Sequence, residues 1–102
     1  MAAKNDVFRG EGFGIRVTPG ALALTRKSNK IGLRELLDVV RDYSDFSEAN
    51  DPYGEHDFGS FDWSGEQLFW KIDYYDPELK RYADPLSDEC TRVLTVMLAR
   101  EY

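Results

Sequence analysis

The stretch from Asn50 to Trp63, NDPYGEHDFGSFDW, brings together side chains that are able to do chemistry. It holds the only histidine of the chain, His56, between Glu55 and Asp57. A carboxylate can orient an imidazole for acid or base catalysis, and both groups can ligate a divalent cation. The stretch therefore has three interpretations: a small hydrolase, a metal site, or a surface that a basic partner recognises.

The first two interpretations lack a defining pattern. Neighbouring residues of an extended chain point to opposite sides, so Glu55 and Asp57 would share a face while His56 faced away. The chain has no G-x-S-x-G, P-loop or G-x-G-x-x-G motif, and its carboxylates follow neither EF-hand nor H-E-x-x-H spacing. We assign no catalytic residue, metal or other cofactor, and keep a hydrolase or metal-binding protein centred on Glu55-His56-Asp57 as an alternative.

Charge is distributed unevenly along the chain, whose formal net charge is −6. Residues 1–34 hold seven Lys or Arg and two Asp or Glu. Residues 35–89 hold four Lys or Arg and sixteen Asp or Glu. Residues 42–66 contain eight carboxylates and no Lys or Arg. Such a field repels phosphate and attracts basic surfaces, or it is an ordinary solvated acidic face.

Recognition by a basic partner uses the largest number of these features. Carboxylates can take the positions of phosphates opposite Lys and Arg, and exposed tyrosines add contact area at interfaces. The residues that we predict to bind a partner are Asp51, Tyr53, Glu55, His56, Asp57, Asp62, Asp73, Tyr75 and Asp76.

Composition indicates one folded domain over residues 1–102. The chain is long enough for a real hydrophobic core, and 42% of its residues are hydrophobic. The single cysteine, Cys90, excludes an internal disulfide and fits a reducing cytoplasm. No apolar stretch is long enough to span a membrane and no secretory signal is visible, so we expect a cytoplasmic protein.

The first half of the chain predicts a hairpin and a helix. Ile15 and Val17 alternate with polar residues, and Pro19-Gly20 suits the centre of a type II turn, which would set Val17 opposite Leu22. The following stretch, IGLRELLDVVRDY, spaces its apolar residues for an amphipathic helix. These apolar residues are Leu33, Leu36, Leu37 and Val40.

The second half repeats this plan. A two-residue turn at Ser64-Gly65 would set Gly59 opposite Trp70, so that a missing side chain faces the largest one. Asp84-Pro85 then resembles a helix start, followed by an apolar stripe. The stripe comprises Leu86, Cys90, Val93, Leu94, Met97 and Leu98. The predicted fold is an α+β two-layer sandwich of order ββαββα, with a four-stranded antiparallel sheet and two helices on one face.

Several motifs in fixed order resemble one bacterial family. They are NDVFR, VTPGALAL, NDPYGEHDFG, FWKIDYYDPEL and TRVLTVMLAREY, and they extend from Asn5 to Tyr102. The chain is similar here to the family called domain of unknown function 3768. The resemblance supplies no activity, but it implies a cytoplasmic bacterial protein often carried on plasmids and other mobile elements, where small anti-restriction and anti-CRISPR proteins are also found.

These observations favour a small acidic, non-enzymatic inhibitor. It would dock its carboxylates on the basic nucleic-acid-binding site of a nuclease or a CRISPR surveillance complex. The remaining alternative is a nucleic-acid-binding regulator that uses the basic N-terminal third, although the acidic total charge makes direct nucleic-acid binding the weaker prediction. That patch would comprise Arg9, Arg16, Arg26, Lys27, Lys30 and Arg34, with Phe8 or Phe13 for stacking. A homodimer is also compatible with the sequence.

Overall fold

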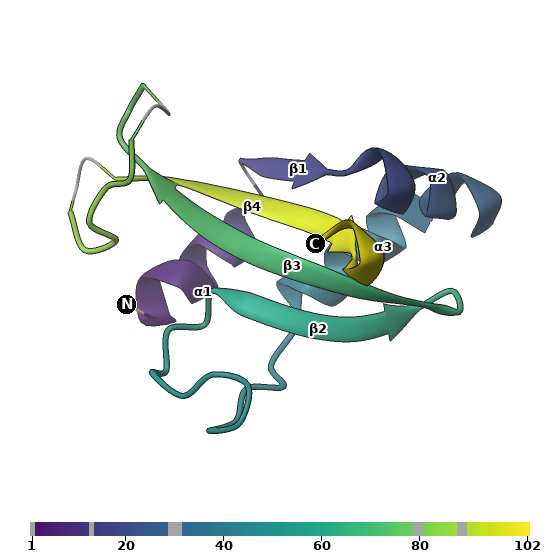
Figure 1. Cartoon of the computed structure of the whole chain (residues 1–102), viewed down its shortest axis with the longest axis horizontal. Helices are drawn as coiled ribbons and strands as arrows, with labels where there is room; N and C mark the ends of the chain where they lie inside the picture. The colour runs from purple at the N-terminus through teal and green to yellow at the C-terminus, as the bar shows by residue number, and fades with distance from the viewer. Residues whose placement is uncertain (1, 13, 29–31, 79–80, 88–89) are drawn as a thin grey trace.

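The computed structural model describes residues 2–12, 14–28, 32–78, 81–87 and 90–102. It contains a four-stranded sheet in the order β1-β4-β3-β2. Three helices cover one face of this sheet (Figure 1). The elements are α1 (Ala2–Glu11), β1 (Ile15–Val17), α2 (Pro19–Ser28), α3 (Gly32–Arg41), β2 (Phe58–Trp63), β3 (Glu66–Tyr75), β4 (Thr91–Leu98) and the short 3₁₀ helix η1 (Ala99–Glu101).

The structure confirms the mixed α+β class but corrects the predicted arrangement. β3 pairs antiparallel with both β2 and β4, whereas β1 pairs parallel with β4, so the sheet is not purely antiparallel. There are three α-helices among the described residues instead of two. The order ββαββα is therefore wrong.

The hairpin of β2 and β3 has the predicted register. Gly59 pairs with Trp70, and a side chain at position 59 would collide with the Trp70 indole. Ser64 and Gly65 have φ angles of 53° and 80°. Positive φ at both central residues defines the turn type that matches the twist of a two-residue hairpin.

The first predicted hairpin is wrong, because the chain turns into a helix at Thr18. The backbone N–H of Leu22 donates to the Thr18 carbonyl at 2.9 Å, and that of Ala21 lies 3.4 Å from Thr18 Oγ1. Thr18 thus caps α2, and Pro19 occupies the first helical position, where its missing N–H costs nothing. A Thr-Pro-Gly sequence suits both a turn and a helix start, and the Ala- and Leu-rich residues after it favour the helix.

The predicted C-terminal helix is also wrong, because Thr91–Leu98 forms the central strand β4. A strand with neighbours on both sides can bury both of its faces, and its apolar run then resembles a helical stripe. Asp84 starts only a turn: its Oδ1 accepts a hydrogen bond from the Leu86 N–H at 2.9 Å. Leu86 itself is 58% exposed.

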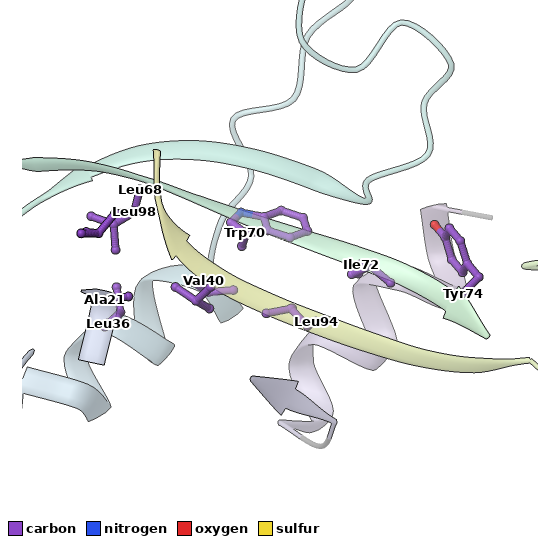
Figure 2. Close-up of a cluster of buried hydrophobic side chains, with 10 residues drawn as sticks. Ala21, Leu36, Val40, Leu68, Trp70, Ile72, Tyr74, Leu94 and Leu98 are labelled. Carbon is purple, nitrogen blue, oxygen red and sulfur yellow. The ribbon is translucent and has the colours of Figure 1, made fainter. Parts of the chain in front are cut away.

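The core lies between the sheet and the helices. Trp70, Ile72 and Leu94 from β3 and β4 lie on the side of the sheet that faces the helices, in one cluster with Leu36 and Val40 (Figure 2). The predicted amphipathic helix is confirmed as α3, with Leu36 and Val40 fully buried. The opposite face of the sheet carries no described α-helix, and Tyr102, which follows η1, packs there against Phe58 and Phe69.

Candidate functional site

The segment between α3 and β2, residues 43–57, carries five carboxylates and is called the acidic loop below. Short hydrogen bonds within the loop define its path. The Asn50 side chain accepts from the Ser47 N–H at 2.8 Å and donates to the Asp45 carbonyl at 2.8 Å. Asp51 Oδ1 accepts from the Glu55 N–H at 3.0 Å, and Gly54 bends the chain with φ of 62°. Asn50, Asp51 and Gly54 thus take the roles that these residue types commonly have in turns.

His56 connects the loop to α1. Its Nδ1 lies 3.0 Å from Asp6 Oδ1, and its Nε2 lies 3.6 Å from Asp51 Oδ2. The imidazole stacks on Phe46 with a centroid distance of 3.8 Å and an interplanar angle of 4°. The carboxylates that flank the ring therefore come from Asp6 and Asp51, and not from its sequence neighbours Glu55 and Asp57.

Asn5 is the buried junction of a second connection. Its Nδ2 donates to the Glu55 carbonyl and to Tyr74 Oη, both at 2.9 Å, while its Oδ1 accepts from Arg92 Nε at 2.7 Å. Tyr74 Oη in turn donates to Asp57 Oδ2 at 3.0 Å. Asn5 is 0% exposed, so one amide joins α1, the acidic loop, β3 and β4.

Arg9 on α1 contacts the start of the acidic loop. Its Nη2 donates to the Tyr43 carbonyl at 2.8 Å, and the guanidinium lies over the rings of Trp70 and Phe46 at 4.8 and 5.3 Å. Burial lowers the pKa of Arg9, while the nearby Asp6 acts in the opposite direction. Because Arg9 is 6% exposed, it cannot belong to a basic surface for nucleic acid.

The excess of negative charge on the acidic loop affects the pKa of Glu55. The pKa of Glu55 is raised, first by burial and then by the charges of Asp57 and Asp51. Burial also raises the pKa of Tyr74, with Asp57 adding to the effect, while the hydrogen bond with Asn5 lowers it. A cation placed beside these carboxylates would relieve their repulsion.

The structure divides the nine predicted partner-binding residues between separate regions. Asp51, Tyr53, Glu55, His56 and Asp57 lie together on the acidic loop. Asp62 lies near the hairpin turn, and Asp73 and Tyr75 point to the helix-free face of β3, where Asp73 pairs with Lys71 at 3.0 Å. Asp76 follows the end of β3. The nine residues therefore do not form one continuous surface.

In the described ranges, no group of three or more His, Cys, Asp or Glu side chains is arranged to hold a metal ion. Of the predicted basic patch, Arg16, Arg26 and Arg34 are exposed. Phe13 and Lys30, and the side chain of Lys27, lie outside what the structure describes. In the same ranges, no helix has the length and apolarity needed to cross a membrane.

Sequence reasoning missed the residues that hold the loop in place. Asn5, Asp6 and Arg9 lie on α1, between 34 and 69 residues from their partners on the loop and β3. Only a helical spacing of polar side chains hints at their shared face. Phe46 and Arg92 were missed for the same reason. Their roles depend on tertiary contacts that the local sequence does not reveal.

Comparison with known proteins gives one match. The chain belongs to the family described as protein of unknown function DUF3768, whose model matches residues 17–101. This confirms the resemblance seen in the sequence. No curated protein and no solved structure matches the chain. The matched range leaves out α1, so Asn5, Asp6 and Arg9 all lie outside it.

Proposed function

We propose that this protein is a non-enzymatic interaction protein that docks its acidic loop on a basic surface of a protein partner. One observation carries the proposal: the loop holds five carboxylates without a single Lys or Arg, and their mutual repulsion contributes to the raised pKa of Glu55. A basic partner would supply the missing positive charge.

The loop is also held in a defined shape before any partner binds. Asp51 and Asp57 accept hydrogen bonds within the protein, and His56 is fixed between Phe46 and α1. These contacts leave Asp45 and Glu48 exposed, and Tyr53 is 85% exposed. A preordered loop loses less conformational freedom on binding, which favours affinity.

The specific partner in this proposal is a nucleic-acid-binding site on a nuclease or a CRISPR surveillance complex. Carboxylates can replace phosphates opposite Lys and Arg, and they pair with guanidinium groups in a bidentate geometry. An anti-restriction or anti-CRISPR role also fits the mobile elements that the family resemblance implies. Within this proposal Asp45, Glu48 and Tyr53 make the principal contacts, and Asp51 and Asp57 maintain the shape of the loop.

The proposal is tested by affinity capture from a nuclease-treated bacterial lysate at low and high salt. The bait is compared with a variant that neutralises two exposed loop carboxylates, Asp45→Asn with Glu48→Gln. The matched control, Glu11→Gln with Glu35→Gln, removes two charges from the exposed faces of α1 and α3. The expected result is a basic protein retained at low salt by the bait and the control, and lost with the loop variant. Equal retention by all three would contradict the proposal.

A further inference from the structure

The outer edge of the sheet at β2 offers unpaired backbone groups. β2 is the last strand in the order β1-β4-β3-β2, so among the described strands it has a neighbour only on the β3 side. The N–H of Ile72 donates to the Asp57 carbonyl at 2.8 Å, which makes these two residues a hydrogen-bonded pair. Since such pairs alternate along an antiparallel ladder, the backbone N–H and C=O groups of Ser60 and Asp62 point away from β3.

Most of this edge lacks the features that usually keep edge strands from pairing. Natural proteins protect an edge with charged side chains, proline, a bulge or a covering element. Beyond the acidic loop, β2 carries one such feature, the exposed Asp62, whose charge disfavours an acidic strand but not a basic one. β2 has the sequence FGSFDW and pairs with β3 without interruption. The acidic loop lies beside the first part of β2, on the side away from β3, whereas no described helix or strand lies beside the part that leads to the Ser64-Gly65 turn (Figure 1).

Charge indicates which kind of segment fits this edge. Asp62 is exposed at one end of β2, and the acidic loop stands at the other. An added strand would pass between these carboxylates, so basic side chains at alternate positions would meet negative charge. A second copy of this chain would instead bring its own net charge of −6 and an identical acidic edge, and like charges placed opposite each other are unfavourable.

We infer that the edge of β2 at Ser60 and Asp62 binds an extended basic segment of the partner as a fifth strand. The inference rests on the proposed function and specifies the conformation of the partner. Main-chain hydrogen bonds to Ser60 and Asp62 would provide affinity, as in other cases of strand addition, and the flanking carboxylates would select arginine and lysine.

The probe is a short synthetic peptide in which arginine and valine alternate. Its control has the same side chains but is methylated on every backbone nitrogen, which removes the donors and keeps the charge. We expect the methylated peptide to bind at least about tenfold more weakly. In the unmodified complex, amide hydrogen exchange at Ser60 and Asp62 should slow by about tenfold, while exposed amides of α3 keep their rates.

Three outcomes would overturn the inference. These are binding of the unmodified peptide weaker than about 1 mM, equal affinity of the two peptides, or unchanged exchange at Ser60 and Asp62 in the complex. If the two peptides bind with equal affinity and both lose it with the double variant Asp45→Asn, Glu48→Gln, strand addition is excluded and the acidic loop remains the docking surface. Exchange that slows with protein concentration alone would identify a second copy as the occupant.

Discussion

The Nδ1 atom of His56 on the acidic loop lies 3.0 Å from Oδ1 of Asp6 on α1, fifty residues earlier in the chain. This contact, together with the stacking of His56 on Phe46, attaches the loop to the rest of the protein. His56 also has a positive φ of 54°, a conformation that a residue with a side chain adopts only when its surroundings favour it. His56 therefore holds the acidic loop, with its carboxylates, against α1.

A double-mutant cycle measures this attachment. His56→Ala should lower the free energy of unfolding by about 1 kcal/mol, because it removes both the stacking and the contact with Asp6. Asp6→Ala also removes the carboxylate that lies 3.4 Å from the buried guanidinium of Arg9, so it should cost at least as much. The coupling between the two changes should be about 0.5 kcal/mol, since the His56–Asp6 pair is partly exposed. Chemical denaturation of the four proteins gives these values. Strictly additive effects would show that the two side chains do not interact.

Asn5 should be among the most sensitive polar positions of the chain. Asn5→Ala leaves the Glu55 carbonyl and Arg92 Nε without their buried partner, so we expect a loss of about 3 kcal/mol in unfolding free energy. Lys4→Ala, on the exposed side of the same helix, is the matched control and should cost less than about 0.5 kcal/mol. Similar losses for the two variants in thermal or chemical unfolding would contradict the buried network.

Glu101 should make stability depend on acidic pH. Burial alone would raise its pKa, but hydrogen bonds from Thr18, Leu98 and Gly20 outweigh this effect and lower the pKa below its ordinary value of 4.5. A carboxyl group of this kind stabilises the fold above its unfolded pKa, and the contribution is lost as pH falls through its folded pKa. Glu101→Gln should therefore melt a few degrees lower than the parent near neutral pH.

The pH profile separates this effect from a general loss of packing. The difference in melting temperature between the parent and Glu101→Gln should shrink as pH falls from about 5 to about 3. Glu11→Gln, on an exposed part of α1, should melt like the parent at pH 7. A Glu101→Gln deficit that stays constant over this pH range would show that the carboxylate charge is not responsible.

The turn between β2 and β3 offers a stabilising change. Ser64 has a positive φ, and asparagine tolerates this conformation better than serine does. Ser64→Asn should therefore raise the free energy of unfolding by about 0.5 kcal/mol, whereas the β-branched Ser64→Val should lower it. Denaturation midpoints would rank the three proteins, and a more stable valine variant would be inconsistent with the turn.

Local signals account for the parts of the fold that the sequence predicts correctly. The β2–β3 hairpin follows from a two-residue turn and from the pairing of Gly59 with Trp70, which all lie within one stretch of twelve residues. The helix α3 follows from the spacing of Leu36 and Val40. In both cases the signal, a turn or a periodic apolar face, lies within one short segment of the chain.

The errors occur where tertiary context decides. Thr91–Leu98 is a central strand because β1 and β3 lie on either side of it, and its apolar residues do not reveal those neighbours. The helix α1 buries Asn5 and Arg9, two polar residues that no hydrophobic pattern selects. For the candidate site, the sequence locates the acidic loop, but the Asp6–His56 contact depends on a helix that was not predicted.

The central claim is that the acidic loop binds a basic partner through charge. The most direct measurement is the affinity of the captured and purified partner for the parent protein and for Asp45→Asn with Glu48→Gln, at low and at high salt. We predict that the variant binds about tenfold more weakly at low salt and that the difference narrows as salt rises. Equal affinities of the two proteins at low salt would contradict the account.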